Sequence, residues 1–205
     1  MNKIDFKKEM EELYRPKTGV VSEVVVPKMN FLMIDGKGNP NTSKEFKDAI
    51  EALYPVAYTI KFGIKKTQGI DFGVMPLEGL WWSDDFHDFT TGKKDNWFWT
   101  LMIMQPDMVT EDIFNKALVD VKAKKNPLLI DKVRFESFDE GQSAQIMHIG
   151  PFSAEGPNIK KVHDHIKEAG GKFDGKVQKH HEIYLSDMRR TSPEKLKTII
   201  RQSYI

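Results

Sequence analysis

The sequence predicts an α+β fold made of a duplicated strand-helix-strand-strand module, with pseudo-two-fold symmetry, helices on one side of antiparallel sheets and a central ligand cleft. The first observation is that a pair of apolar strand-like segments, followed by a turn and a helical stretch, occurs at 20–34 and again at 133–149. The second is that each copy continues into a strand with a carboxylate among aromatic residues, at Glu78 and Glu182. The offset, roughly 113 residues, is too long for a solenoid repeat and indicates a duplicated module.

The duplication, more than the chain length, favours a single domain over residues 1–205. No stretch rich in Pro, Gly or Ser separates the two copies, and the connection at 122–127 is short and charged, as in a turn after a helix. We therefore expect the halves, about 19–126 and about 131–205, to share one core. A separate N-terminal helix is expected at about 5–15.

The first predicted elements follow from hydrophobic spacing. Residues 5–15 place apolar side chains on one helical face and end ahead of Pro16. The β-branched or apolar runs at 20–26 and 29–34 flank Pro27 and predict a hairpin.

The long helix of the first half is capped by Asn41 or Thr42 and extends toward Lys65, with a kink or break at Pro55. The rest of this half is predicted as strands at 70–82 and 97–105, polar turns at 83–96, and a helix at 110–122. The second half is predicted as strands at 132–138 and 142–149, a helix at 156–169, and strands at 179–185 and 196–204. Each half therefore has the order strand, strand, helix, strand, strand.

Composition excludes several classes of function. Lys+Arg 31 nearly cancels Asp+Glu 30, which gives no electrostatic case for direct nucleic-acid binding. The absence of cysteine excludes disulfides, zinc-thiolate sites and a cysteine nucleophile. The N-terminus is too charged for a signal peptide and no window is apolar enough for a membrane span, so we expect a cytoplasmic protein with no membrane partner.

The histidines and glycines do not form a metal or cofactor motif. His163 and His165 point in different directions on a helix, and His180 and His181 point to opposite faces of a strand, so neither pair chelates a metal by itself. Dinucleotide-binding and phosphate-loop glycine patterns are missing. We therefore expect no metal and no cofactor.

The two carboxylate-bearing strands carry the candidate chemistry. Alternation places Glu78 on one face with Trp82, and Glu182 on one face with Tyr184. If both strands lie near the symmetry axis, the two glutamates approach each other across the cleft. Desolvation among aromatic rings raises the pKa of a carboxyl group and suits it to general acid or base catalysis, and the same site attracts a cation. The alternative is that each glutamate simply faces solvent.

Other side chains are candidates for lining the cleft. A shift of the strand faces by one residue exchanges Trp82 for Trp81. His148 is a candidate second polar group, with a structural histidine at a strand end as the alternative, and core packing is the alternative for Trp97. The predicted ligand-binding residues are Trp82, Trp81, Tyr184, His148, Phe152, Tyr58 and Trp97.

Four segments carry a resemblance to a known family. Residues 148–152, 182–187 and 189–200 resemble the GyrI-like small-molecule-binding family, and residues 76–82 resemble its stand-alone branch. The resemblance extends from about residue 19 over nearly the whole chain. It implies the duplicated module and an aromatic cleft for drug-like, often cationic molecules, with Glu182 as the buried acid that faces the ligand and with Trp82 and Tyr184 as contacts.

The resemblance leaves three functions open. Some stand-alone members of the family hydrolyse cyclopropane-bearing DNA-alkylating natural products, which implies a cyclopropanoid cyclopropyl hydrolase for detoxification, with Glu182 and Glu78 activating water. In regulators of the family the domain is an effector-binding sensor, which implies a non-catalytic binder of cationic aromatic drugs. The family name also suggests a partner protein that modulates a topoisomerase. The ligand and the oligomeric state are open as well.

Overall fold

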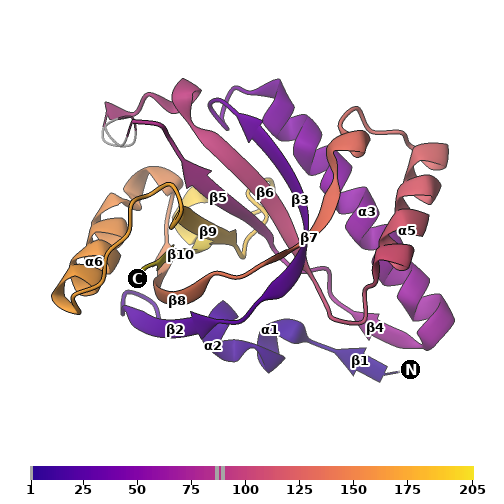
Figure 1. Cartoon of the computed structure of the whole chain (residues 1–205), viewed down its shortest axis with the longest axis horizontal. Helices are drawn as coiled ribbons and strands as arrows, with labels where there is room; N and C mark the ends of the chain where they lie inside the picture. The colour runs from indigo at the N-terminus through magenta and orange to yellow at the C-terminus, as the bar shows by residue number, and fades with distance from the viewer. Residues whose placement is uncertain (1, 86–87, 89–90) are drawn as a thin grey trace.

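The computed structural model describes residues 2–85, 88 and 91–205. It confirms the α+β fold, with one eight-stranded antiparallel sheet in the order β2-β8-β10-β9-β5-β6-β3-β7 and a short parallel pair of β1 with β4 (Figure 1). The strands are β1 (Asn2–Ile4), β2 (Ser22–Val26), β3 (Met29–Lys37), β4 (Ile70–Phe72), β5 (Leu77–Trp82), β6 (Phe98–Gln105), β7 (Arg134–Phe138), β8 (Gly141–Ile149), β9 (His180–Tyr184) and β10 (Lys197–Ser203). The helices are α1 (Phe6–Glu9), α2 (Glu11–Tyr14), α3 (Lys44–Gln68), α5 (Glu111–Lys124) and α6 (Gly156–Glu168).

The strand order is symmetric about the pairing of β5 with β9. The first module supplies β2, β3, α3, β5 and β6, and the second supplies β7, β8, α6, β9 and β10 in the same order. When each strand is replaced by its counterpart in the other module, the same strand order results, read from the opposite edge of the sheet. The pseudo-two-fold axis therefore passes through the β5–β9 pair.

The predicted hairpin of the first two sheet strands is wrong. β2 pairs with β8 of the other module, whereas β3 pairs with β6 and β7. Two-residue hairpin turns need a positive φ, and neither Pro27 nor Lys28 has one. The chain therefore continues in an extended form from one half of the sheet to the other, and the two modules exchange their first strands.

Helix α3 runs through Pro55 without interruption, so the predicted break does not occur. Proline inside a helix costs about 3 kcal/mol or more because one backbone hydrogen bond is lost. The helix offsets this cost with a buried apolar stripe that includes Leu53, Val56 and Ile60. Its N-cap is Ser43, which accepts a hydrogen bond from the Phe46 amide at 3.3 Å.

Within the described residues, no helix combines the length and the apolar character needed to cross a membrane.

Two further predicted elements are divided in the structure. The N-terminal helix is two short helices, α1 and α2, which meet at Met10. The strand predicted at 70–82 is split into β4, which pairs with β1, and β5, which lies in the large sheet. Of the turns predicted at 83–96, residues 86, 87, 89 and 90 lie outside the described residues.

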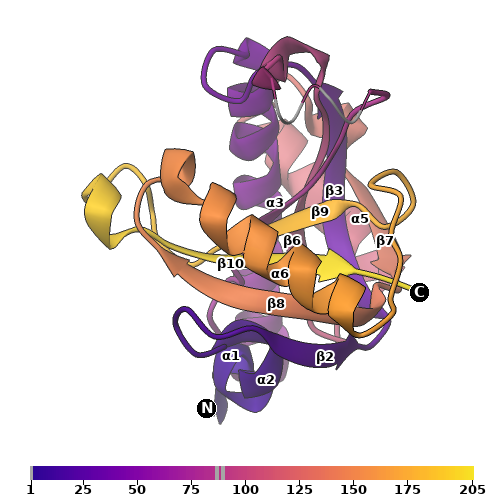
Figure 2. The same cartoon turned by 90° about the vertical axis from the view of Figure 1, so that its left-hand side faces the viewer.

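Helices α3 and α6 cover the same face of the sheet. Phe46 of α3 stacks on Trp81 at a ring-centroid distance of 5.8 Å, which places α3 on the Trp81 face of β5. Helix α6 packs its apolar side on Ile200 of β10, which lies directly opposite Glu182. Glu182 in turn lies opposite Gly79, and Gly79 projects from the same face of β5 as Trp81. Helices α3 and α6 therefore cover the same face of the sheet. Figure 2 shows α6 crossing β8 and β10.

Gly36 of β3 gives a test of this packing. A Cβ atom at Gly36 would lie 2.1 Å from Trp99 Cη2, so Gly36→Ala is expected to destabilise the protein by about 1–3 kcal/mol through overpacking. Gly63 of α3 is the matched control, because no atom lies within 4 Å of its added Cβ and alanine favours a helix. Urea unfolding should show lower stability for Gly36→Ala and unchanged or higher stability for Gly63→Ala. Equal stabilities would contradict the packing of Trp99 over Gly36.

Candidate ligand cavity

A large cavity lies over the β5–β9 pair, between α3 and α6. Its volume is about 1610 Å³, larger than the roughly 300–1,000 Å³ of ordinary small-molecule sites. Its aromatic lining consists of Phe46, Tyr54, Tyr58, Trp81, Trp97, Phe152, Phe173 and Tyr184. Both modules contribute rings, so the cavity has the size and lining to enclose a large apolar or flat molecule.

Six of the nine predicted site residues line this cavity. They are Glu182, Tyr184, Trp81, Trp97, Tyr58 and Phe152. The lining does not include Glu78, Trp82 or His148. The placement shows which side chains can reach a ligand, and their roles stay predictions.

Strand register decides which tryptophan faces the cavity. In the antiparallel pair, Trp81 lies opposite His180, and Gly79 lies opposite Glu182. Directly opposite residues project from the same face, so Trp81 joins Glu182 in the cavity. Trp82 projects to the other face, where it stacks on Phe98 at 5.7 Å.

The expected meeting of Glu78 with Glu182 is wrong. Glu78 lies opposite Ile183, which places it on the face away from the cavity. A two-fold axis perpendicular to a sheet maps each face onto itself, so residues on opposite faces are not symmetry equivalents. The two strands are similar in sequence, but their glutamates therefore do not occupy equivalent positions in the structure.

Two cavity side chains, Tyr184 and His180, contact Glu182 directly, and Trp81 contacts the first of them. Tyr184 Oη donates a hydrogen bond to Glu182 Oε2 at 2.7 Å, and His180 Nε2 lies 3.1 Å from Glu182 Oε1. Trp81 Nε1 donates to Tyr184 Oη at 3.1 Å, which links the aromatic wall to the carboxylate. Burial acts to raise the pKa of Glu182, but the contacts with His180 and Tyr184 outweigh it and hold the pKa below its ordinary value. Glu182 is therefore ionised at neutral pH.

Glu155 is a second cavity acid, which the sequence analysis missed. It immediately precedes α6 but makes no capping hydrogen bond, and only 4% of its surface is exposed. Burial, followed by the charge of the neighbouring Glu182, raises the pKa of Glu155 to about 9. Its Oε1 atom has no hydrogen-bond partner among the described residues. The cavity therefore holds one protonated carboxyl group beside one carboxylate.

Sequence signals for the missed residues were present but weak. An acidic residue at a helix start is ordinarily explained by the helix dipole, which gives no reason to place Glu155 in a cleft. Strand alternation also puts His180 on the face of Glu182, and this is the signal in the sequence that places it beside the carboxylate. The described residues contain no group of three or more His, Asp or Glu side chains arranged to hold a metal ion.

The rings around the carboxyl pair meet at their edges and faces. Trp81 and Trp97 form an edge-to-face pair at 5.9 Å, and Phe152 and Tyr184 form another at 5.7 Å. Edge-to-face pairs fix the orientation of these rings. Aromatic faces beside an ionised carboxylate attract cations and flat electron-poor molecules.

His148 has the structural role that was the alternative prediction. Its Nδ1 lies 3.0 Å from Asn158 Nδ2 and its Nε2 lies 3.2 Å from the Pro151 carbonyl oxygen. Both ring nitrogens are therefore occupied, and the side chain ties the end of β8 to α6.

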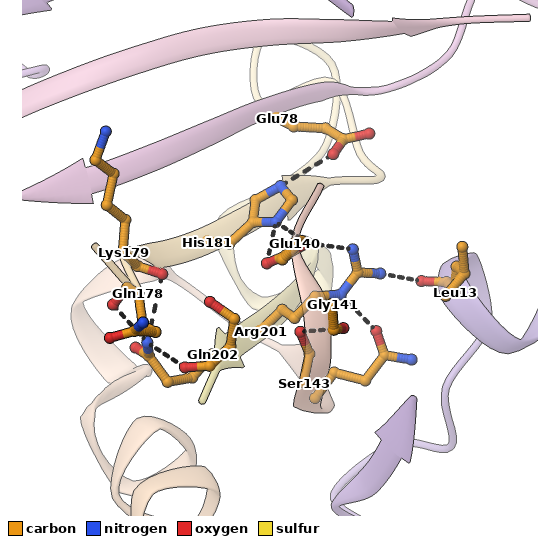
Figure 3. Close-up of polar contacts among 12 residues, drawn as sticks. Leu13, Glu78, Glu140, Gly141, Ser143, Gln178, Lys179, His181, Arg201 and Gln202 are labelled. Carbon is orange, nitrogen blue, oxygen red and sulfur yellow. Dashed lines mark hydrogen bonds and ion pairs between the residues drawn. The ribbon is translucent and has the colours of Figure 1, made fainter. Parts of the chain in front are cut away.

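On the opposite face, Glu78 belongs to a buried ion cluster centred on His181 (Figure 3). His181 Nε2 lies 2.9 Å from Glu78 Oε2, and His181 Nδ1 lies 2.9 Å from Glu140 Oε1. Arg201 Nη1 donates to Glu140 Oε2 at 3.2 Å, and Tyr14 Oη donates to Glu78 Oε1 at 2.9 Å. The cluster joins β5, β9 and β10 to the N-terminal segment beneath the cavity floor.

The carboxylates of the cluster keep His181 charged. Burial alone would lower the pKa of His181, but Glu140 and Glu78 outweigh it and raise the pKa to about 9. Burial would likewise raise the pKa of Glu140, but His181 and Arg201 lower it to about 2. A buried charge that loses its partner is costly, so all members of the cluster depend on one another.

Comparison with known proteins identifies the family. The model of the GyrI-like small-molecule-binding domain matches residues 20–202. The chain belongs to this family. A search of curated protein sequences gave no match.

Solved structures support the assignment. An uncharacterized conserved protein from Listeria innocua is 41% identical, with a TM-score of 0.90, over 98% of this chain and 100% of that one. A protein described as a hydrolase from Listeria innocua is also 41% identical, with a TM-score of 0.85 over the same shares of the two chains. The C-terminal domain of EcmrR shares the fold at 9% identity, with a TM-score of 0.55, over 91% of this chain and 97% of that domain. Proteins at both high and low sequence identity therefore share the fold of this chain.

The charged state of His181 predicts how stability depends on pH. The folded pKa of about 9 lies above the unfolded value of about 6.5, so the stabilisation is complete below pH 6.5 and is lost as the pH rises to 9. The loss is on the order of 3 kcal/mol. Urea unfolding between pH 6 and 10 should show this loss in the wild type and a smaller one in His181→Gln.

Comparing the two proteins isolates His181. The raised pKa of Glu155 also makes the fold less stable as the pH rises toward 9, but Glu155 titrates in both proteins. The same dependence on pH in His181→Gln as in the wild type would contradict a charged His181.

Proposed function

We propose that this protein binds flat, cationic or electron-poor aromatic molecules and hydrolyses those that carry a strained cyclopropane ring. The observation that carries the proposal is the carboxyl pair in the aromatic cavity, where the pKa of Glu182 is lowered and that of Glu155 is raised to about 9. Two carboxyl groups whose pKa values are separated in this way supply a base and an acid at neutral pH. The 41% identity to a Listeria innocua protein described as a hydrolase supports turnover as well as binding.

In the proposed reaction, the aromatic wall clamps the substrate beside Glu182. A water oxygen attacks a cyclopropane carbon and forms a C–O bond while Glu182 takes a proton from that water. The strained C–C bond breaks, and its electron pair moves to the attached acceptor group, which Glu155 protonates. Proton transfer from Glu182 to Glu155 then restores the starting state. The net change is the addition of one water, and general acid–base assistance of this kind contributes about 10²–10⁴-fold to a rate.

The surroundings of Glu182 fit the role of a positioned base. Its two oxygens are fixed by Tyr184 at 2.7 Å and His180 at 3.1 Å, so the carboxylate has a defined orientation toward the cavity. Gly79, directly opposite on β5, has no side chain and so leaves room for the contact of Trp81 Nε1 with Tyr184 Oη, which orients the carboxylate. Binding of a water molecule and a flat electrophile beside this fixed carboxylate lowers the barrier through proximity.

The second candidate function is binding or sensing without turnover. The specific observation in its favour is the ionised Glu182 among ring faces, which is an arrangement that attracts aromatic cations. In that case Glu182 acts through its charge, and the proton of Glu155 has no catalytic part. The two candidates differ in what the loss of each acid does.

Replacing Glu182 with glutamine keeps the shape of the side chain and removes the base. Turnover of a cyclopropane-bearing alkylating compound, followed by mass spectrometry of the water-added product, is expected to fall about 10²–10⁴-fold in Glu182→Gln while affinity is retained. Glu51→Gln is the matched control, because Glu51 also lines the cavity but lies at an exposed position. Normal turnover by Glu182→Gln would exclude Glu182 as the base, and lost affinity with no wild-type turnover would favour the binding function.

The pH dependence of the two functions has opposite signs. Hydrolysis needs the protonated form of Glu155, so kcat should fall as the pH rises through its pKa of about 9. Cation affinity should instead increase over the same range, since Glu155 becomes a second negative charge. Both should lose this dependence in Glu155→Gln, with circular dichroism confirming the fold at each pH. A wild-type kcat that does not change between pH 7 and 10 would contradict an acid role for Glu155.

A further inference from the structure

One cationic side chain of the aromatic cavity, Lys94, has no part in the reaction described above. It begins the 3₁₀ turn Lys94–Asn96 that leads into β6, and it is a half-buried member of the cavity lining. The Trp97 amide closes this turn by donating to the Lys94 carbonyl oxygen at 3.1 Å. Side chains three positions apart eclipse one another in a 3₁₀ turn, and Lys94 Nζ lies 5.2 Å from the centroid of the Trp97 ring. The cation–π contact therefore holds a positive charge at the aromatic wall.

Lys94 acts on both cavity acids without contacting either. Within the part of the chain that the structure describes, no ion pair joins Lys94 to a carboxylate. Burial and the charge of Glu182 raise the pKa of Glu155 to about 9, and the charge of Lys94 acts against that rise. Burial acts to raise the pKa of Glu182, whereas hydrogen bonds with two neighbours and the charge of Lys94 lower it. The ammonium group and the two acids therefore line one cavity with space between them.

A positive charge at this place has opposite consequences for two kinds of ligand. A permanent cation is attracted by the carboxylate of Glu182 but repelled by the ammonium group of Lys94. An uncharged, electron-poor molecule with an acceptor oxygen instead gains a charge-assisted hydrogen bond from Lys94. The same hydrogen bond becomes stronger when the strained C–C bond breaks, because the electron pair moves to the acceptor group. A fixed cation beside a developing negative charge lowers the barrier.

We propose that Lys94 determines which ligands the cavity accepts, by disfavouring permanent cations and by binding the acceptor group of uncharged, electron-poor aromatic molecules. This role rests on the proposed function and narrows its range of substrates to the uncharged ones. Lys94 forms and breaks no covalent bond in the reaction, and Glu155 remains the proton donor. The first module therefore supplies the cation of the site, and the second supplies the two acids.

Two ligands of the same shape and different charge test this role. N-methylacridinium is a flat permanent cation, and N-methylacridone is an uncharged molecule with the same fused rings and a carbonyl oxygen. Lys94→Gln should bind the cation about tenfold more tightly, because a like charge is removed. It should bind the ketone about tenfold more weakly, because a hydrogen bond from a charged donor is lost. Isothermal titration calorimetry at neutral pH measures both affinities.

Two further variants are the controls. Lys93→Gln makes the same change in net charge at the neighbouring exposed position, which does not line the cavity, and should leave both affinities unchanged. Lys94→Arg keeps the charge and the donors and should retain the preference of the wild type. General damage to the cavity would weaken the binding of both ligands. The proposal fails if Lys94→Gln changes the two affinities in the same direction or not at all, or if Lys93→Gln has the same effect.

Turnover separates this role from the proposed hydrolysis. With the cyclopropane-bearing compound, kcat should fall about tenfold or more in Lys94→Gln, and an unchanged kcat would contradict a contact of Lys94 with the acceptor group. If the wild type shows no turnover but the two ligands respond in opposite directions, hydrolysis is wrong and Lys94 still selects ligands. If the wild type binds neither ligand, the proposed function of the cavity is wrong, and the role of Lys94 fails with it.

Discussion

The antiparallel pairing of β5 with β9 is the constraint on which the rest of the molecule depends. It joins the two modules into one sheet, and its register assigns every neighbouring side chain to a face. Trp81, Glu182 and Tyr184 project into the cavity, while Glu78 and His181 project into the buried ion cluster. A slip of one residue would place the catalytic candidates in the core and the ion cluster in the cavity, so this register is strongly specified.

The sequence predicted local elements well because their signals are local. Strands and helices of both modules were placed within a few residues, since apolar periodicity and N-caps act over a few positions. Pairing is not local. The separation of β2 from β3 depends on the absence of a tight turn at 27–28, and residue types alone suggested the hairpin. The continuous helix through Pro55 depends on burial against the sheet, which outweighs the local cost of proline.

The candidate site was predictable to the extent that it depends on one strand. Glu182 and Tyr184 share a face by simple alternation, and the structure places both in the cavity. The choice between Trp81 and Trp82 needed the register with β9, which the sequence does not contain. Glu155 was missed for a different reason, because its significance comes from burial beside Glu182, a contact between α6 and β9 that no sequence spacing reveals.

Among the described residues, the second module places a pair of carboxyl groups in the cavity that the first module does not repeat, and the β5–β9 pair explains why. The second module supplies the acids Glu155 and Glu182, whereas the first supplies much of the aromatic wall, including Trp81 and Trp97. Opposite Glu182, β5 carries Gly79, where a Cβ atom would lie 2.8 Å from Trp81 Nε1 and 3.2 Å from Tyr184 Oη. Any side chain there would press on the contact that links Trp81 to Tyr184 and, through it, to Glu182. The missing side chain in one module is therefore a condition for the organised carboxylate in the other, and the two modules are no longer interchangeable.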